Sequence, residues 1–245
     1  MKKDMSHDHA PHAIKARLHA GPDDTYIKEW VYGGIDGVVT TFAVIAGVIG
    51  AQLSPLIVMV IGLASLFSDG FSMAAGCYSA TKTDEDNYKR LHDFELQSIQ
   101  SHPEGEIEEI RQIFKSKGFE GEALETAVNT IIENNTAWIG MMLVEEYGLT
   151  KNHPNAMKAA LNTFLAFLLC GAMPILPFLL YLPHSFLISI ILSGFTFFAI
   201  GAIKSYWSLK SWWWHGVETF IIGMAAALIA FGTGYGLRIL GIFSA

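Results

Sequence analysis

Two aspartates stand alone within long apolar stretches of the sequence, where ionisable side chains are costly. Asp36 is the one charged residue of the segment 31–53, and Asp69 is the one charged residue of the segment 55–80. An ionisable group at membrane depth costs roughly 2.5–3.5 kcal/mol on insertion scales, so each of the two is a functional hypothesis. Met73 follows Asp69 by one helical turn and adds a soft thioether to hard carboxylate oxygens. Ordinary packing would explain Met73 alone, but the three residues together favour a path for a cation.

The first of these stretches also carries a stripe of small residues at helical spacing. Small residues let two helix backbones approach closely in a membrane. Asp36 lies four residues before Thr40, at the edge of the stripe. A carboxylate at a close helix contact, for example across a dimer axis, fits a cation path better than contact with lipid. The stripe consists of Gly33, Gly37, Thr40, Ala43, Gly47 and Gly50.

A second group of candidate ligands lies in the acidic segment 81–157, which contains 15 acidic and 7 basic residues. Glu106 and Glu109 are three residues apart and share a helical face. Met142 and Glu146 are four residues apart and share another. Both pairs could therefore present their side chains to one bound ion.

Glu95 adds another carboxylate, one turn after His92, on the helix that enters the acidic segment. Clustered carboxylates repel one another unless a cation lies between them. Hard cations prefer carboxylate oxygen and thioethers prefer softer metals, so a mixture of glutamate and methionine suits a borderline ion such as Fe²⁺. A solvated acidic surface is the alternative interpretation for any one of these glutamate pairs.

Five apolar segments are long enough to cross a bilayer, which takes about 20 mostly apolar residues as a helix. Of the 245 residues, 51% are hydrophobic and 16% are charged, whereas a soluble domain carries about a quarter charged residues. None of the segments alternates with period two, which argues against barrel strands. The buried core of a soluble helical protein is the less favoured alternative. The segments are 31–53, 55–80, 159–182, 184–203 and 216–237.

The positions of lysine and arginine predict the orientation of these spans. Fifteen of the 16 basic residues lie in the N-terminal segment, in the acidic segment with its flank, or in the loop 204–215. The positive-inside rule then places the N-terminus and the acidic segment in the cytosol and the C-terminus outside. Glu218 lies one turn inside the cytosolic end of the fifth span. It either pairs with Lys204 or relays protons.

The charge and cysteine counts argue against several classes of protein. A net charge of −7 argues against a nucleic-acid partner, which calls for a basic surface. Two cysteines cannot staple a chain of this length. The polar N-terminus does not resemble a cleaved signal peptide, and its short length fits a prokaryotic inner membrane better than an organelle.

The sequence thus predicts an all-α integral membrane protein with five transmembrane helices and a cytosolic helical domain inserted between spans two and three. The second span has no Pro or Gly from Cys77 to His102, so we expect it to continue as one helix out of the membrane. Three further helices are expected at 104–117, 122–133 and 136–147. The predicted parts are a polar tail with histidines (1–29), spans one and two (30–80), the acidic domain (81–157) and spans three to five (158–245).

Four segments resemble motifs of the vacuolar iron transporter family, in the form found in prokaryotic members. The resemblance runs from about Trp30 to the end of the chain, and the first two motifs together are fairly specific. The segments are DGVVTTFA at 36–43, SDGFSMAAGCY at 68–78, GAMPILP at 171–177 and ETFIIG at 218–223.

The resemblance implies a five-span homodimer, not an enzyme, that exports Fe²⁺ from the cytosol in exchange for protons. It implies a path between the two first spans, with Asp36 and Met73 on it. Mn²⁺ or Zn²⁺ is the alternative transported or bound ion, and no permanent cofactor is expected. The implied cytosolic metal ligands are Glu95, Glu106, Glu109, Met142 and Glu146.

One departure from the family concerns the helix that carries Glu95. The family tends to have a second glutamate three residues later, where this chain has Ser98, which leaves the number of bound ions and the metal preference open. A membrane-anchored di-iron ferroxidase or iron-storage protein is the rival function. Such bundles use Glu-x-x-His on two helices, and this chain offers Glu106-x-x-Glu109 and the reversed His92-x-x-Glu95.

Overall fold

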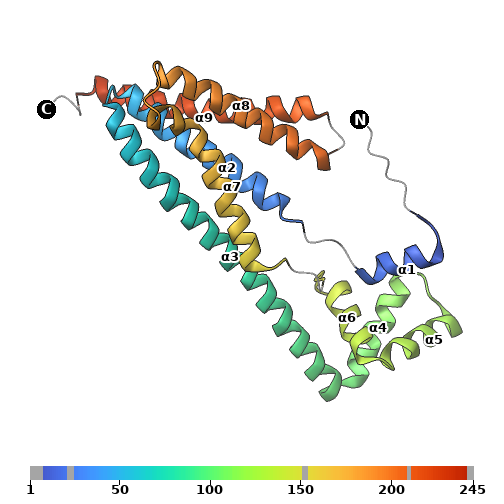
Figure 1. Ribbon diagram of the computed structural model, residues 1–245. Coiled ribbons are helices and arrows are strands. Elements are labelled where there is room, and N and C mark those ends of the chain that lie inside the picture. Colours follow the sequence, from blue (N-terminus) through green and yellow to red (C-terminus); the bar gives the residue numbers. More distant parts are fainter. Residues whose placement is uncertain (1–7, 21–24, 151–153, 209–210, 242–245) are drawn as a thin grey trace. The chain divides into compact units, whose positions relative to one another are not determined.

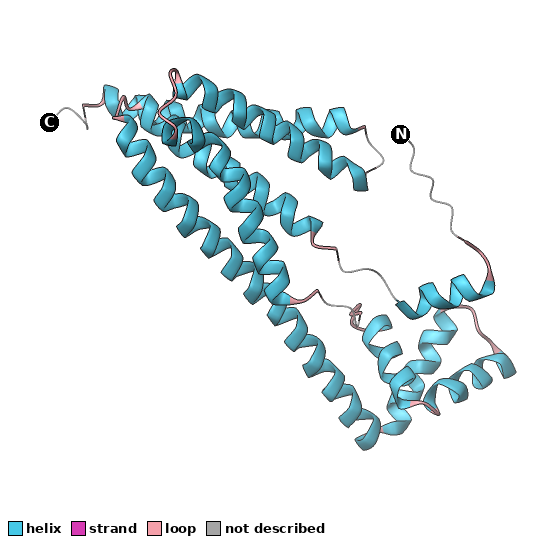
Figure 2. Cartoon of the chain, viewed as in Figure 1, coloured by secondary structure: helices cyan, strands magenta, loops and turns pink. Residues whose placement is uncertain are grey.

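The computed structural model describes residues 8–20, 25–150, 154–208 and 211–241, and within these ranges the chain forms helices and no strand (Figure 2). The chain divides into two compact units. The acidic unit contains Met1–Asp24 and Ala80–Pro154, and the membrane unit contains Thr25–Ser79 and Asn155–Ala245.

Within the described residues, five helices are long and apolar enough to cross a membrane, as the sequence predicted. Each differs from its predicted span by a few residues at its ends, except that α3 runs on without interruption through the acidic segment, which confirms the expected continuous helix (Figure 1). These helices are α2 (Ile27–Gly50), α3 (Pro55–Ser101), α7 (Ala156–Leu179), α8 (Ser185–Lys204) and α9 (Trp212–Ile239).

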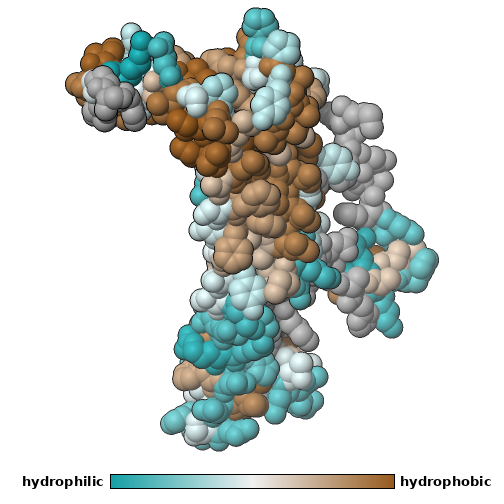
Figure 3. Space-filling model, turned by 60° about the vertical axis from the view of Figure 1, so that its left-hand side comes forward, coloured by the Kyte–Doolittle hydropathy of each residue, from teal (hydrophilic) through white to brown (hydrophobic). Residues whose placement is uncertain are grey.

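The helix α2 is the centre of the membrane unit, where it packs against α7, α8 and α9. Val38 and Phe42 of α2 are buried against Phe197 of α8. Further along, Ile45 of α2 and Ile175 of α7 are fully buried in a second cluster that includes the first part of α3. By contrast, the outer surface of the unit is hydrophobic (Figure 3), as expected for side chains that face lipid.

The small-residue stripe of α2 is used mainly inside the chain. A Cβ atom on Gly37 would collide with the carbonyl oxygen of Phe167 on α7. Gly234 of α9 approaches the backbone of Gly47 equally closely. These glycines therefore bring α7 and α9 against α2, and much of the stripe does not face another copy of the chain. Thr40 remains partly exposed.

One end of the membrane unit is marked by aromatic residues. The indole N–H of Trp30 on α2 donates a hydrogen bond to the side-chain carbonyl of Asn162 on α7, at 2.8 Å. The C-terminal end of α8 lies at this end too, because Lys204 and Lys28 line one cavity. It meets the N-terminal end of α9, where a Cβ on Gly201 would collide with the carbonyl of His215. The three tryptophans that open α9 are more than half exposed. Such a ring of aromatic residues is typical of a membrane–water interface.

The acidic unit contains the second part of α3 and four shorter helices, whose ends follow local sequence signals. Pro103 opens α4, where a missing N–H is tolerated, and the side chain of Asn134 caps α6 by accepting from two backbone N–H groups. The hydrophobic core joins α3 to α4, α5 and α6 through buried residues such as Ile110, Val128 and Leu143. The short helices are α1 (Pro11–Ala20), α4 (Pro103–Ser116), α5 (Gly121–Ile132) and α6 (Asn135–Glu145).

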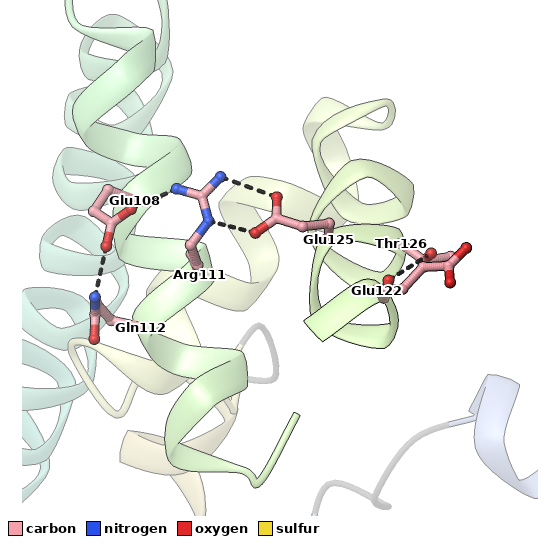
Figure 4. Close-up of polar contacts among 6 residues, drawn as sticks. All are labelled: Glu108, Arg111, Gln112, Glu122, Glu125 and Thr126. Atoms are coloured by element: carbon pink, nitrogen blue, oxygen red, sulfur yellow. Dashed lines mark hydrogen bonds and ion pairs between the residues drawn. The ribbon is translucent and has the colours of Figure 1, made fainter. Parts of the chain in front are cut away.

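An arginine links α4 to α5 on the surface of this unit. Arg111 donates from Nε and Nη2 to the two carboxylate oxygens of Glu125, at 3.0 and 3.2 Å (Figure 4). The same guanidinium also contacts Glu108, one turn earlier on α4. Fork-like pairs of this kind fix geometry as well as charge. Arg111 therefore holds the helix that carries Glu106 and Glu109 in register with α5.

Candidate functional site

The two intramembrane aspartates lie near each other in the membrane unit. Asp36 on α2 and Asp69 on α3 are close enough for their charges to interact. Both side chains are partly buried. Asp69 accepts a hydrogen bond from Ser65, one turn earlier on α3. Two carboxylates whose charges interact in an apolar unit repel each other, and a divalent cation or protons would relieve that repulsion.

Asp36 also faces open space. It lines a cavity of about 690 Å³ that runs along the first half of α2 and reaches Lys204 and Ile222. The hydroxyl of Thr40 turns back to the carbonyl of Asp36 at 2.8 Å, so it is occupied within the helix. Met73, one turn after Asp69 on α3, is partly buried. The structure thus places Asp36 where a hydrated ion could reach it.

The partner of Glu218 in the described structure is His215, which the sequence analysis did not single out. His215 is buried, and its Nδ1 lies 3.2 Å from Glu218 Oε2. Its Nε2 lies 2.8 Å from the hydroxyl of Ser208. Because both ring nitrogens have polar partners, His215 connects Glu218 to the aromatic end of the unit. The spacing of three residues on one helix was the available sequence signal.

In the acidic unit, Glu95 is a carboxylate inside a hydrophobic core. Its exposed fraction is 1%, and its neighbours one turn either way, Leu91 and Ile99, are core residues. Tyr147 donates to its Oε1 at 2.9 Å, whereas Oε2 has no protein donor. Burial raises the pKa of Glu95, although the Tyr147 hydrogen bond works in the opposite direction. A buried oxygen without a donor is a suitable ligand for a cation.

Glu106 and Glu109 on α4 lie next to Glu95, as their shared face predicts. Burial raises the pKa of Glu106 to about 7, with further contributions from the charges of Glu95, Glu109 and Glu146. The pKa of Glu109 is raised too, first by burial and then by Glu146 and Glu95. Glu106 Oε2 is buried and has no donor. Four carboxylates therefore interact at one place, and among the described residues no lysine or arginine contributes to relieving their mutual repulsion.

The two remaining residues of this predicted site, Met142 and Glu146, differ in burial. Met142 is fully buried in the hydrophobic core, whereas Glu146, at the end of α6, is exposed. Within the described residues, no group of three or more His, Cys, Asp or Glu side chains is arranged as a metal site. His92 is exposed and lies beside Asp93, which gives no support to the di-iron arrangement with Glu95.

Two contributors to these sites were not found from the sequence. Tyr147 donates a hydrogen bond to Glu95, and burial next to that carboxylate raises the pKa of the Tyr147 phenol. Glu29, in the first turn of α2, has a buried carboxylate oxygen without a donor. The sequence signals for both were weak: Tyr147 directly follows two glutamates, and Glu29 lies one helical turn before Gly33.

Comparison with known proteins assigns the chain to a family. A model of the VIT family matches residues 27–235, which include both intramembrane aspartates and all the glutamates above. The chain belongs to the VIT family. The match confirms the resemblance read from the four motifs, and with the five apolar helices it identifies a multi-pass membrane protein of a transporter family.

Named members of the VIT family align with most of this chain. Vacuolar iron transporter 1 of Arabidopsis thaliana is 32% identical over 209 residues, which cover 84% of this chain and 83% of that protein. The vacuolar iron transporter of Centaurea cyanus is 30% identical over 214 residues, covering 86% and 87%. That of Toxoplasma gondii is 30% identical over 198 residues, covering 76% and 66%.

Proposed function

We propose that this protein exports a divalent transition metal ion, Fe²⁺ or Mn²⁺, from the cytosol across a membrane in exchange for protons. The observation that carries the proposal is the pair Asp36 and Asp69, two partly buried carboxylates whose charges interact in an apolar helical unit. Iron is favoured because the matching relatives are named iron transporters.

Exchange follows from the chemistry of these carboxylates. A carboxylate binds either a proton or a metal ion, so metal affinity falls as the pH drops. Metal entering from a neutral cytosol displaces protons, and protons from an acidic far side displace metal. Met73, one turn from Asp69, adds a thioether that favours a borderline ion over Mg²⁺.

The acidic unit serves as the cytosolic collector of the same ion. Glu95, Glu106 and Glu109 gather unrelieved negative charge, with Glu146 at the edge of the group. Met142 is buried in the core, so its thioether would have to turn out of the core to reach an ion. The orientation follows the positive-inside rule, with the N-terminus and residues 81–157 in the cytosol and the C-terminus outside. We place the protein in a prokaryotic plasma membrane.

A homodimer completes the path. Along the second half of α2, Thr40 and Ala43 remain partly exposed, and residues of this size permit close approach to a second copy. In a two-fold dimer the same residue of each copy meets across the axis. Ala43→Cys in a background without Cys77 and Cys170 is therefore expected to cross-link. Ile229→Cys on α9 is the exposed control; if it cross-links as efficiently, this interface is wrong.

Transport by the purified protein in sealed vesicles tests the role of the aspartates. Asp36→Asn keeps the size of the side chain and removes its charge, and we expect pH-driven Fe²⁺ flux to be lost. Asp93→Asn, an exposed aspartate of the acidic unit, is the matched control and should transport normally. Full flux in Asp36→Asn would remove this carboxylate from the path.

Calorimetric titration with Fe²⁺ or Mn²⁺ tests the collector separately. The double variant Glu106→Gln with Glu109→Gln should lose binding to the acidic unit. The control is Glu104→Gln with Glu108→Gln, on exposed positions of the same helix. Equal stoichiometry in both double variants would mean that this face of α4 is merely solvated.

A further inference from the structure

Tyr147 follows the end of α6, and the way in which that helix ends fixes its position. Gly148 has a positive φ of 66°, and the N–H of Leu149 bonds to the carbonyl of Leu143 at 2.8 Å. Many helices end with this arrangement. Tyr147 and Leu149 both pack against the hydrophobic core of the acidic unit. The phenol is therefore held in place by backbone geometry and packing, and not only by its own hydrogen bond.

The hydroxyl of Tyr147 makes the two carboxylate oxygens of Glu95 different from each other. It donates to Oε1 at 2.9 Å, whereas Oε2 is buried and has no donor among the described residues. A phenol titrates at about pH 10, so it is a donor at neutral pH. A hydrogen bond to a carboxylate is charge-assisted and strong, and an ion that used Oε1 would have to compete with it. Glu95 therefore offers one strong ligand oxygen rather than two.

Glu106 brings a similar oxygen to the same place from α4. Its Oε2 is also buried without a donor among the described residues, and its side chain is close enough to Glu95 for the two to interact. Glu109 and Glu146 add their charge from exposed positions. The buried part of the acidic site is thus built from single carboxylate oxygens of two helices.

Divalent ions differ in how many oxygens they require. Ca²⁺ takes about six to eight, and it often uses both oxygens of one carboxylate. Mn²⁺ is bound in octahedral sites, where single oxygens are sufficient. We propose that Tyr147 determines the metal specificity of the acidic unit: by holding Oε1, it prevents Glu95 from binding an ion through both oxygens and so disfavours Ca²⁺. This inference rests on the proposed role of the acidic unit as a collector of metal.

A purely structural role for Tyr147 is the alternative. In that case the hydrogen bond would stabilise the buried carboxylate and have no influence on the choice of ion. The ratio of two affinities distinguishes the roles. Loss of a structural contact would weaken the binding of every ion alike, whereas loss of a contact that restricts Glu95 would weaken Mn²⁺ and leave Ca²⁺ bound as well as before or better.

Calorimetric titration of the full chain in detergent measures this ratio, with Mn²⁺ and Ca²⁺ as separate probes. All proteins carry Asp36→Asn with Asp69→Asn, so that the acidic unit reports alone. The test variant is Tyr147→Phe, and the matched control is Tyr88→Phe, at a partly buried tyrosine of α3 that packs against the same core. Because Tyr147→Phe removes a stabilising hydrogen bond, 4-fluorophenylalanine at position 147 is a second variant, which fills the space of the hydroxyl but donates no proton. Circular dichroism verifies that each protein is folded at the temperature of the titration.

We expect the protein with Tyr147 to bind Mn²⁺ more tightly than Ca²⁺. Partners that orient a metal ligand typically contribute at least about tenfold to affinity. Tyr147→Phe should therefore bind Mn²⁺ about tenfold more weakly, with no loss of Ca²⁺ affinity, and the second variant should lower the ratio in the same way. Tyr88→Phe should keep the ratio unchanged.

An unchanged ratio in both variants at position 147, whether both affinities fall or neither does, would overturn the proposal. It would do so alone, because Mn²⁺ binding by the acidic unit and pH-driven Fe²⁺ transport by the wild type would still stand. Absence of any Mn²⁺ binding in the protein with Tyr147 would overturn the collector and this inference together.

Discussion

Replacing Glu106 by glutamine is expected to stabilise the acidic unit of the metal-free protein at alkaline pH. Burial and three neighbouring carboxylates raise the pKa of Glu106 from 4.5 to about 7. In the unfolded chain the same group titrates near its ordinary value. Between these two pH values the folded state binds more protons than the unfolded state, so stability falls as the pH rises through this window. Above pH 7 the whole penalty is present, and below pH 4.5 it is absent.

The size of the effect follows from the shift. A pKa raised by about 2.5 units corresponds to about 3.4 kcal/mol at 1.36 kcal/mol per unit. The Glu106 side chain is only partly buried, and screening by solvent reduces the figure to about 1.5 kcal/mol. Glutamine keeps the size and removes the charge. A free-energy change of about 1.5 kcal/mol is about a tenfold change in an opening equilibrium.

Hydrogen exchange measured by mass spectrometry reports this equilibrium locally. With metal chelated, peptides from α4 and α6 of Glu106→Gln should exchange on the order of tenfold more slowly than wild type at pH 8, and the difference should narrow at pH 5. Glu108→Gln is the control on the same helix: hydrogen bonds from Gln112 and Arg111 lower the pKa of Glu108, so its loss should speed exchange at pH 8. Unchanged or faster exchange in Glu106→Gln at pH 8 would refute the reasoning.

Three further substitutions test the packing of each unit. Gly37→Ala should lower the free energy of unfolding by about 1–3 kcal/mol, seen as a lower melting temperature in detergent, because the new Cβ would meet the backbone of α7. Gly232→Ala is the control: Gly232 has open space around it, so the change should be neutral or stabilising. Asn134→Ala removes the cap of α6 and should cost about 1 kcal/mol, seen as faster exchange in the first turn of that helix; protection equal to wild type would contradict the role of the cap. Tyr147→Phe leaves the buried Glu95 without its donor and should cost about 1–3 kcal/mol; unchanged exchange in α6 would show that the hydrogen bond contributes little.

The helices could be predicted because their signals are local. Apolar runs of sufficient length, with at most one charged residue each, define the spans. Pro103 and Gly118 mark the limits of α4, with Gly118 at a positive φ of 88°. The proximity of Glu95 to Glu106 was harder to predict, because it depends on how α3 and α4 pack. One face of α3 carries Leu91, Glu95 and Ile99. Because this face is buried, the Glu95 carboxylate lies in the core.

The partners of several residues could not be predicted, because a pattern on one helix does not say which helix it meets. The small residues of α2 indicated a close contact, but α7 and α9 supply most of it from the same chain. Met142 and Glu146 share a face by spacing, yet Met142 packs inside while Glu146 lies at the C-terminal end of α6, where the helix stops. For Glu218 the sequence indicated either a pair with Lys204 or a role in relaying protons, and the partner found at 3.2 Å is His215.

Metal and proton movement across sealed vesicles measures the central claim most directly. The purified protein is placed in vesicles that contain one dye for Fe²⁺ and one for pH, with an acidic interior and Fe²⁺ outside. The account predicts that Fe²⁺ enters while the interior becomes more alkaline, and that dissipating the pH gradient slows metal entry. Vesicles with the protein that remain as impermeable to Fe²⁺ and Mn²⁺ as empty ones, in either direction of the gradient, would contradict it.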